Sequence, residues 1–579
     1  MKRATGKKVV EVNVAAGRRW LVYIVMLAMG GLLIARAVDL HVRDRDFLRN
    51  QGEARQHRVV SIPAHRGMLL DRNGEPLAIS TPVDTLWAEP ERLAQSDQLG
   101  KLARVLDIST SGLKKKLEGT KSREFAYLRR HVDPELSKSA MALEIDGVHV
   151  QREYRRYYPF GEVTSHVLGF TNIDDQGQEG LELAYHEWLA GKPGARRVIR
   201  DRLGRAIADI ESIRPARPGR NLTLSIDKRL QYVAYRELQN AVQTHKARSS
   251  SAVVLDVNTG EVLAMVNQPA YNPNRRTGRT GPQSRNRAVT DVLEPGSTMK
   301  PITLAAALES GEFDLASVIA TEPGFYSVGS HEVKDHRNYG DLDLAGILQK
   351  SSNVGASKIA LSLDPQQMWS VYDRFGFGQP TGSGFPGEAT GTLNHASQWR
   401  KIEQATLSFG YGVSMTPLQL ARAYAAIAAG GVLPEISFLK QDDVPPGRRV
   451  ISREVALQLH ELMETVLEPG GSGTRARVLG YRVAGKTGTS WKSRAGGYDE
   501  DRHMALFAGF APASRPEVVV LIVVDEPSVG GFYGGVVAAP VFSKLMSSAL
   551  RLRGTLPDDW QPDNGLQQAQ AVPDGQGDV

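Results

Sequence analysis

The sequence predicts a multidomain α+β chain with a single transmembrane helix near its N-terminus. Its 579 residues exceed one ordinary domain. One apolar run, at residues 20–38, is long enough to cross a bilayer. The rest of the chain mixes helix and strand patterns on either side of a proline-rich segment at 214–219. We therefore expect a membrane anchor followed by two folded domains.

Composition and charge exclude several classes of protein. A hydrophobic fraction of 41% and a charged fraction of 23% are typical of a globular protein, not of a disordered or polytopic membrane protein. The net charge of +7 comes with no zinc-finger or RNA-recognition motif, so we assign it to surface and membrane electrostatics. The chain has no cysteine, which excludes disulfides and thiolate chemistry. Its 13 histidines form no H-E-x-x-H or comparable cluster, and we predict no metal site and no cofactor.

Residues 1–19 are predicted to be a cytoplasmic tail and residues 20–38 a transmembrane helix. The apolar run is interrupted only near its end, by Arg36, which can snorkel to the membrane interface. A cleaved signal peptide is the alternative, but the run is longer than a usual signal and no A-x-A site follows it. The positive-inside rule then predicts that everything after about residue 39 lies outside the cytoplasm. The basic residues of the tail are Lys2, Arg3, Lys7, Lys8, Arg18 and Arg19, against the single acid Glu11.

Residues 39–220 are predicted to form an irregular, elongated α+β module. Helix and strand signals alternate there with turn sequences such as Arg72-Asn73-Gly74 and Lys192-Pro193-Gly194. The segment 214–219 is basic, rich in proline and poor in apolar residues. It predicts a linker or an exposed connection, and a domain boundary near residue 220.

The second predicted domain begins with a helix and antiparallel strands. Apolar residues recur at helical spacing over 228–245. Strands at 252–257 and 261–266 flank an Asn-Thr-Gly turn, and a further pair is predicted at 504–511 and 517–524.

Two polar segments of this part of the chain are predicted to lack regular structure. Residues 275–287 are basic and contain glycine, which predicts a mobile loop at the entrance to the site that follows. Residues 554–579 are rich in Pro, Gln, Asp and Gly, which predicts a disordered tail. The second domain is therefore expected to span 221–553.

Ser297-Thr298-Met299-Lys300 is the candidate nucleophile motif, and a helical run at 301–308 follows it. Residues three apart share one face of a helix, so the Lys300 amine can approach the Ser297 hydroxyl and accept its proton. This requires a lowered lysine pKa, which burial and a second nearby cation would both provide. The same S-x-x-K pattern also begins at Ser111, Ser225 and Ser437, where we expect solvated surface residues.

Two motifs further along the chain single out Ser297. Ser351-Ser352-Asn353 offers a hydroxyl for proton relay and an amide that can hold a substrate peptide. Lys486-Thr487-Gly488-Thr489 offers a glycine that a substrate backbone can approach, and a lysine and hydroxyls suited to a terminal carboxylate. The order S-x-x-K, S-x-N, K-T-G is typical of β-lactamases and penicillin-binding proteins. The sequence therefore predicts a serine acyltransferase.

The sequence resembles the class B penicillin-binding proteins, and within them the FtsI-type septal transpeptidases, also called penicillin-binding protein 3. The resemblance covers nearly the whole chain. Asn353-Val354-Gly355 favours division, because elongation-specific relatives commonly carry Asp at the third position of the middle motif. In the N-terminal module the matching residues are Arg66-Gly67, Asp71-Arg72-Asn73-Gly74, Arg156-Tyr157-Tyr158-Pro159 and Gly180-Leu181-Glu182. In the second domain they are Glu294-Pro295-Gly296-Ser297, Ser351-Ser352-Asn353-Val354-Gly355, Gly485-Lys486-Thr487-Gly488-Thr489 and Ala538-Ala539-Pro540-Val541-Phe542.

The resemblance implies both a fold and a reaction. The N-terminal module is expected to be a class B pedestal of the dimerisation type. The C-terminal domain is expected to be a serine β-lactamase-like transpeptidase domain, with a five-stranded antiparallel sheet flanked by helices and Ser297 opening the central helix. The implied substrate is the D-alanyl-D-alanine end of a peptidoglycan stem peptide. An acyl-enzyme on Ser297 then passes to an amine of a neighbouring peptide, and β-lactam antibiotics block the serine covalently.

The resemblance also implies roles for individual residues. Lys300 is expected to be the acylation base, and the backbone N–H groups of Ser297 and Thr489 are expected to stabilise the oxyanion. Trp491 departs from the family, which often has a basic residue there after a small one at the position of Ser490. The implied catalytic set is Ser297, Lys300, Ser351, Asn353 and Lys486. The implied substrate-binding set is Thr487, Gly488, Thr489, Tyr411, Phe532 and Tyr533, of which the three aromatic residues would wall the cleft.

The family also implies a location and partners. The chain is expected to cross the bacterial inner membrane once, with its catalytic domain in the periplasm. Its transmembrane helix and pedestal are expected to dock onto a septal glycan polymerase of the SEDS class, which is FtsW-like, and onto other membrane proteins of the divisome. No nucleic acid is expected as a partner.

Four other functions remain open from the motifs. A β-lactamase would need a carboxylate to activate the deacylating water and would normally be a smaller, released protein. A D,D-carboxypeptidase differs only in using water in place of the acceptor amine. A β-lactam sensor would carry several membrane spans, and an idle division scaffold need not retain Ser297, Lys300 and Lys486 together.

Overall fold

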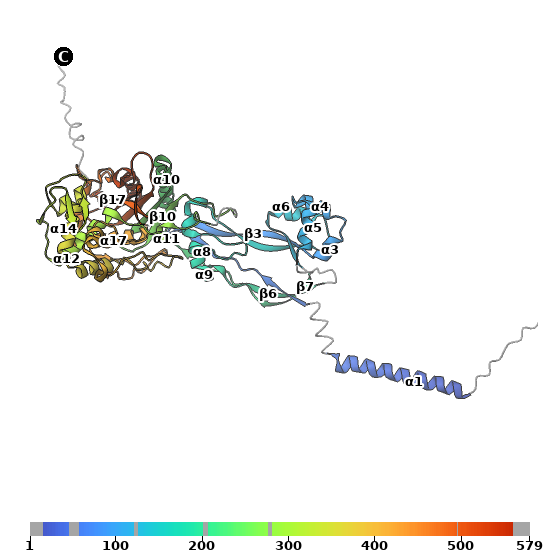
Figure 1. Ribbon diagram of the computed structural model, residues 1–579. Helices are drawn as coiled ribbons and strands as arrows, with labels where there is room; N and C mark the ends of the chain where they lie inside the picture. Colours follow the sequence, from blue (N-terminus) through green and yellow to red (C-terminus); the bar gives the residue numbers. More distant parts are fainter. Residues whose placement is uncertain are drawn as a thin grey trace, which may run out of the picture. The chain divides into compact units, whose positions relative to one another are not determined.

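The structure, a computed structural model, describes residues 16–45, 57–120, 125–200, 206–275, 281–494 and 496–559 (Figure 1). It contains two compact units. The first consists of Met1–Ala64, Asp84–Glu153 and Lys192–Arg217, and the second of His65–Val83, Tyr154–Gly191 and Pro218–Val579. Two strands, β3 (Pro76–Ala88) and β5 (Val148–Tyr157), belong to both units. The S-x-x-K, S-x-N and K-T-G motifs all lie in the second unit.

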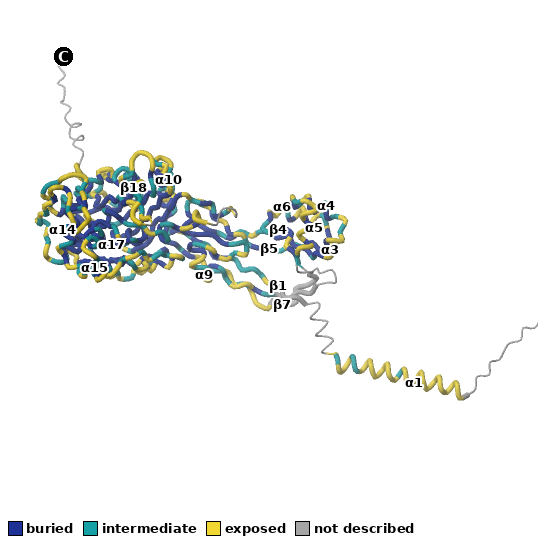
Figure 2. Tube along the Cα trace, in the orientation of Figure 1, coloured by how far each residue is buried: buried dark blue, intermediate teal, exposed yellow. Residues whose placement is uncertain are grey.

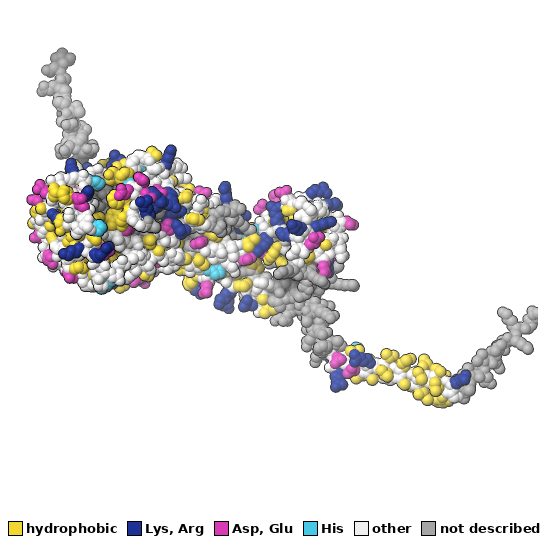
Figure 3. Space-filling view, viewed as in Figure 1, with side chains coloured by type: hydrophobic (Ala, Val, Ile, Leu, Met, Phe, Trp, Pro, Cys, Tyr) yellow, Lys and Arg dark blue, Asp and Glu magenta, His cyan; other side chains and the backbone are white. Residues whose placement is uncertain are grey.

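The helix α1 (Ala16–Val38) carries apolar side chains along its length (Figure 3), and a turn of π-helix, Asp39–Arg43, follows it. Nearly all of its side chains are exposed. A stretch within Gly17–Arg43 has a mean hydropathy of 2.2 and is long enough to cross a membrane. The predicted segment 20–38 lies inside α1, which begins at Ala16, whereas residues 1–15 of the predicted tail lie outside the described residues.

The rest of the first unit contains a small helical lobe and a separate sheet. In the lobe, β4 (Ala126–Val132) pairs with β3, and leucines such as Leu86, Leu102 and Leu113 are completely buried. Its helices are α3 (Pro90–Ala94), α4 (Leu99–Val105), α5 (Thr110–Glu118) and α6 (Pro134–Met141). The separate antiparallel sheet has the order β1 (His57–Ile62), β6 (Gly194–Arg200) and β7 (Ala206–Arg214).

Three motifs of the N-terminal module meet in the second unit at a buried ion cluster. Arg66 Nε donates to Glu182 Oε2 at 2.8 Å, and Arg156 Nε donates to Glu182 Oε1 at 2.6 Å. Buried charges persist only when they are paired in this way. The short elements around the cluster are β2 (Leu69–Leu70), α7 (Ser165–Leu168), α8 (Gly180–Ala184), α9 (His186–Ala190) and β8 (Leu222–Thr223).

A five-stranded antiparallel sheet forms the centre of the second unit, as the resemblance predicted. Its order is β10 (Val262–Gln268), β9 (Ser249–Asp256), β19 (Val518–Asp525), β18 (Gly497–Ala511) and β17 (Ala484–Arg494). The four strands predicted from sequence patterns are all present. β17, which carries the K-T-G motif, ends the sheet and therefore has one edge free of strand pairing.

Both faces of this sheet are covered by helices. Every residue of β9 and β10 is buried, and the interior of the unit is dark blue in Figure 2. One layer contains α10 (Lys228–His245), whose bounds match the prediction, together with α20 (Ala539–Arg553). The other layer contains α17 (Pro417–Ala428) and α18 (Arg453–Glu464).

The helix that follows the nucleophile motif, α12 (Lys300–Ser310), is buried on all sides over its first nine residues, Lys300 to Leu308. Such a helix is held in place by its surroundings rather than by one apolar stripe. The remaining helices are α11 (Arg287–Thr290), α13 (Leu344–Lys350), α14 (Asn353–Ser362), α15 (Pro365–Arg374), α16 (Lys401–Leu407) and α19 (Gly534–Val537). The remaining strands are β11 (Val318–Ala320), β12 (Phe325–Val328), β13 (His331–Lys334), β14 (Asp341–Asp343), β15 (Val432–Leu433) and β16 (Arg448–Arg449).

Three segments were predicted to lack regular structure: residues 214–219, 275–287 and 554–579. The connection at 214–219 is mostly exposed, as predicted, but its backbone is paired: Arg217 N donates to Lys192 O at 2.9 Å. Within the predicted mobile loop, residues 276–280 lie outside the described residues. The same holds for residues 560–579 of the predicted disordered tail.

Candidate active site

Ser297 lies in a turn of 3-10 helix, Gly296–Met299, that leads directly into α12. Its side chain is half-buried. Gly296 has a φ of +55°, and a Cβ there would come within 2.9 Å of the Thr489 carbonyl oxygen. Only glycine combines this left-handed conformation with so close an approach. The turn therefore holds Ser297 against β17, next to the K-T-G motif.

Lys300 connects the first two motifs. Its side chain is completely buried, and Nζ lies 3.0 Å from Ser297 Oγ. The same nitrogen donates to Asn353 Oδ1 at 2.8 Å and to the Ser351 carbonyl oxygen at 2.6 Å, and lies 3.2 Å from Ser351 Oγ. One amine therefore touches the hydroxyls of both motif serines.

Lys486 brings the third motif to the same point. Its side chain is also completely buried, and Nζ lies 3.0 Å from Ser351 Oγ. It also donates to Thr487 Oγ1 and to the Thr487 carbonyl oxygen, each at 3.2 Å. The Ser351 hydroxyl thus lies between two lysine amines, and a hydroxyl can donate one hydrogen bond while it accepts others.

Burial of the two lysines changes their protonation. Burial lowers the pKa of Lys300 to about 7, while the charge of Asp335 opposes this change. Burial, and then the positive charge of Lys300, lower the pKa of Lys486 well below its usual range. Two ammonium groups that share one hydroxyl repel each other in a low-dielectric interior. At least one of the two amines is therefore neutral near pH 7 and able to accept a proton.

Ser351 itself adopts a left-handed backbone conformation, with a φ of +60°. It ends α13, and α14 begins two residues later at Asn353. A non-glycine residue in this region is uncommon and persists where its surroundings fix it. This conformation turns both the carbonyl oxygen and the hydroxyl of Ser351 toward Lys300.

Asp335, which the sequence reasoning did not identify, holds the middle motif in place. Its Oδ1 accepts from the backbone N–H groups of Asn353 at 2.5 Å and Val354 at 3.1 Å. Its Oδ2 accepts from Ser352 Oγ at 2.5 Å. Asp335 lies in the loop after β13, where no motif or periodicity marks it. Its carboxylate satisfies donors at the N-terminus of α14, as capping side chains do.

The K-T-G motif occupies the free edge of β17. Gly488 serves the packing of the chain itself, because a Cβ there would come within 2.8 Å of Thr298 Cγ2 and 2.9 Å of the Pro295 carbonyl oxygen. That this glycine also lets a substrate backbone approach the strand stays a prediction. Thr487 Oγ1 donates to Ser472 Oγ at 2.9 Å, and Thr489 Oγ1 accepts from Gly534 N at 3.0 Å.

The three predicted cleft aromatics fall into two groups. Tyr411 OH accepts from Trp491 N at 3.1 Å, and burial raises the pKa of Tyr411 to about 12. Phe532 stacks on His503 with 3.9 Å between ring centroids and also contacts Tyr533 at 4.5 Å. Tyr533 immediately precedes Gly534, whose N–H binds Thr489. The aromatics thus flank β17, while Ser297, Lys300, Ser351, Asn353 and Lys486 form one hydrogen-bonded cluster.

The other S-x-x-K serines lie in different environments. Ser111 is exposed, as predicted. Ser225 is completely buried, so the prediction of a solvated residue is wrong there. Its hydroxyl donates to the carbonyl oxygens of Val262 at 2.7 Å and Ser437 at 3.1 Å, which compensates for its burial. Ser437 is half-buried, and its hydroxyl donates to Leu439 O at 2.9 Å.

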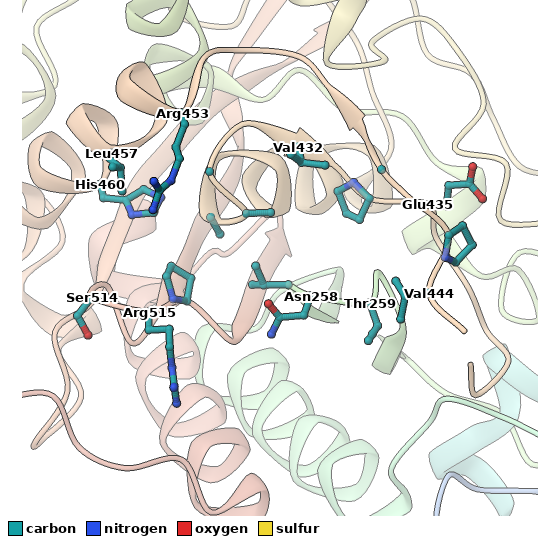
Figure 4. A pocket seen from close by; sticks show the side chains of 18 residues that line it. Asn258, Thr259, Val432, Glu435, Val444, Arg453, Leu457, His460, Ser514 and Arg515 are labelled. Carbon is teal, nitrogen blue, oxygen red and sulfur yellow. The ribbon is translucent and has the colours of Figure 1, made fainter. Parts of the chain in front are cut away.

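A separate cavity of about 440 Å³ contains none of the predicted site residues. Arg453 and His460 of α18 lie on one side of it, and Asn258 and Thr259 of the turn between β9 and β10 lie on another (Figure 4). It is therefore distinct from the cluster around Ser297.

Two family models match the chain. Residues 250–547 match the penicillin binding protein transpeptidase domain, and residues 61–224 match the penicillin-binding protein dimerisation domain. The first model spans the whole cluster from Ser297 to Lys486.

Several named proteins are similar to the chain over nearly its whole length. The peptidoglycan D,D-transpeptidase FtsI of Escherichia coli K12 is 44% identical over 540 residues, which cover 92% of this chain and 91% of that protein. The probable peptidoglycan D,D-transpeptidase PenA of Neisseria gonorrhoeae is 43% identical over 546 residues, covering 93% and 94%.

Two solved structures are also similar. The transpeptidase domain of Burkholderia pseudomallei penicillin-binding protein 3 matches with a TM-score of 0.54 and 42% identity, over 58% of this chain and 98% of that one. A peptidoglycan synthetase from Bifidobacterium adolescentis matches with a TM-score of 0.70 and 26% identity, over 88% of this chain and 99% of that one.

The fold, the serine–lysine cluster and these matches define a penicillin-binding serine acyltransferase. The chain belongs to the penicillin-binding protein transpeptidases, and within them to the FtsI-type proteins. The family predicted from the sequence motifs is thereby confirmed.

Asp335→Ala is expected to destabilise the protein by roughly 3 kcal/mol, because it leaves three donors at the start of α14 without a partner. Asp343→Ala is the matched control: it removes a helix-capping acid that accepts from Gly346 N, and should cost about 1 kcal/mol. Urea unfolding followed by tryptophan fluorescence measures both changes. Equal losses in the two variants would show that Asp335 is an ordinary helix cap.

Proposed function

We propose that the chain is a peptidoglycan D,D-transpeptidase that cross-links stem peptides at the division septum through an acyl-enzyme on Ser297. β-Lactams, which mimic the donor peptide, acylate the same serine. The observation that carries this proposal is the 3.0 Å contact between Lys300 Nζ and Ser297 Oγ, inside a cluster that also contains Ser351, Asn353 and Lys486. The transpeptidase domain of this proposal spans residues 221–553.

Acylation begins with a proton transfer. Neutral Lys300 takes the proton of Ser297 as Oγ attacks the penultimate carbonyl carbon of the D-alanyl-D-alanine end. The backbone N–H groups of Ser297 and Thr489 stabilise the oxyanion that forms. The peptide C–N bond then breaks, and the leaving nitrogen takes a proton delivered through Ser351, which touches both Lys300 and Lys486. D-alanine departs, and the peptide remains as an ester on Ser297.

Deacylation reverses these roles with a new amine. The nitrogen of a neighbouring stem peptide bonds to the acyl carbon, the bond to Ser297 Oγ breaks, and the proton from the nitrogen returns to Oγ through Lys300. Asn353 holds the donor peptide, while the hydroxyls of Thr487 and Thr489 face its terminal carboxylate. Gly488 lets β17 pack against Thr298 and Pro295 beside Ser297. Tyr411, Phe532 and Tyr533 wall the cleft.

Mass spectrometry of the protein after incubation with penicillin tests the class and the nucleophile together. One adduct is expected, on the peptide that contains Ser297, and Ser297→Ala should abolish it. Turnover should fall by roughly 10⁴-fold or more, as for other serine acyltransferases. The matched control is Ser225→Ala, because Ser225 begins another S-x-x-K sequence and is completely buried. An adduct that survives Ser297→Ala would contradict the assignment.

The proposal also includes a location. The chain crosses the inner membrane once through α1, with its N-terminus in the cytoplasm and its catalytic domain in the periplasm. The apolar exposed surface of α1 and the basic residues Arg18 and Arg19 at its start support this orientation. We further propose that α1 and the pedestal dock onto an FtsW-like glycan polymerase of the SEDS class, which raises the local concentration of the enzyme at the septum.

Exchange of α1 for an unrelated transmembrane helix tests the docking. The hybrid should label with penicillin like the native chain, because every acylation residue lies at Ser297 or later in the sequence. Cells that depend on the hybrid should nevertheless grow as filaments. A second variant, exported by a cleavable signal without any anchor, should fail in the same way. Normal septation with the exchanged helix at native abundance would show that α1 is only a tether.

A further inference from the structure

The cavity of about 440 Å³ that is distinct from the active-site cluster has apolar side chains at its rim. Leu457 of α18 and Val444 both line it, and each of these residues is 45% exposed. Val432 and Pro516 belong to the same lining. Sites that bind small groups in proteins are typically cavities of roughly 300 to 1,000 Å³ with mostly apolar walls. The cavity therefore has the size and the walls of a site for a bulky apolar side chain.

Positive charge predominates around this cavity. Arg453 and Arg515 lie on opposite sides of it (Figure 4). Arg453 forms no ion pair with any residue that the structure describes, whereas Arg515 pairs with Glu517 at 3.2 Å. Glu435 is the one acid among the described residues of the lining. A segment of negative charge is therefore the electrostatic complement of this rim.

The chain that follows α20 leads to the wall of this cavity. Residues 554–559 extend from the end of α20, in one helical layer, toward α18 in the other. Asp558 Oδ1 accepts from Arg482 N at 2.8 Å, and the Arg482 guanidinium pairs with Glu464, the last residue of α18. Asp558 Oδ2 accepts from Ser514 Oγ at 2.6 Å, and Ser514 lines the cavity. The chain is thus bonded to the cavity wall where its described part ends.

The segment 560–579, which lies outside the described residues, is complementary to the cavity in composition. It contains three aspartates and neither lysine nor arginine. It begins with Trp560, two residues after Asp558, and two residues of chain span at most about 7 Å. An indole is a large apolar group, and an arginine can bind its face through a cation–π contact. Asp563, three residues further on, supplies a carboxylate for an arginine.

We propose that segment 560–579 occupies this cavity, with the Trp560 indole against the apolar walls and Asp563 paired with Arg453. The contact of Asp558 with the wall holds the chain at the rim, so the local concentration of the indole at the cavity is high. The bound segment covers the exposed apolar side chains of the rim. The site is separate from the active-site cluster, and acylation does not depend on it.

Cross-linking between two introduced cysteines tests the proposal, because the native chain contains no cysteine. Gln561→Cys places one thiol next to the indole. Asn258→Cys places the other on an exposed residue of the lining that belongs neither to the apolar walls nor to the arginines. The rate of cross-linking by a short bismaleimide is measured in the full-length protein in detergent.

Leu479→Cys, combined with Gln561→Cys, is the matched control for random encounters. Leu479 is 99% exposed, and it precedes Gly480, whose carbonyl oxygen accepts from Asp559 N at 3.1 Å. A segment that is not bound to the cavity therefore meets this position at least as often as it meets Asn258.

The cross-link to Asn258→Cys should form roughly tenfold or more faster than the cross-link to Leu479→Cys, because binding holds residue 561 at the cavity. Trp560→Ala should abolish this preference, and Arg453→Gln should reduce it. Arg551→Gln is the control for the loss of a charge, since Arg551 lies on α20 and lines a different groove, and it should leave the preference unchanged. Penicillin acylation at the native rate checks that each variant is folded.

Three results would overturn the proposal. A rate for Asn258→Cys equal to or below that for Leu479→Cys would show that the segment does not occupy the cavity. A preference that survives either Trp560→Ala or Arg453→Gln in full would show that the proposed contacts do not hold the segment. Equally fast cross-linking between chains that each carry one of the two cysteines would assign the cavity to the segment of a second copy.

Discussion

Two buried lysine amines that meet at one serine hydroxyl organise the active site. Lys300 and Lys486 are completely buried, and each lies within 3.2 Å of Ser351 Oγ. Two charged amines that both contact one hydroxyl in a low-dielectric interior would repel each other strongly. The arrangement is stable because burial lowers both pKa values, so that protons move easily among the two amines and the hydroxyl between them.

The surrounding structure brings three distant segments to that hydroxyl. The turn at Gly296 sets Ser297 and Lys300 against β17, where a side chain in place of either Gly296 or Gly488 would collide with the facing segment. Asp335 fixes the start of α14, directly after Ser351 with its left-handed conformation. β17 ends the sheet, and its free edge therefore borders the cluster.

The sequence predicted the elements that have a regular apolar pattern and the site residues that belong to a motif. The helix α10 has a clear apolar period, and the four strands predicted from their patterns are present. The order of the three motifs predicted that Ser297, Ser351 and Lys486 share one site, and the structure places them together. Asp335 could not be predicted, because a single loop acid binds the middle motif only through tertiary contacts. Ser225 was misjudged for a similar reason: its hydroxyl is satisfied by two carbonyl groups that the fold supplies from other segments.

The pH dependence of acylation tests the lysine cluster most directly. Lys300 accepts a proton only when neutral, so the rate constant of β-lactam acylation should fall as the pH drops below about 7 and level off above it. Lys300→Arg, which keeps the cation but cannot lose its proton, should acylate slowly at every pH. A rate constant that is flat through pH 7, with Lys300→Arg close to wild type, would show that the charge of Lys300 matters and its basicity does not.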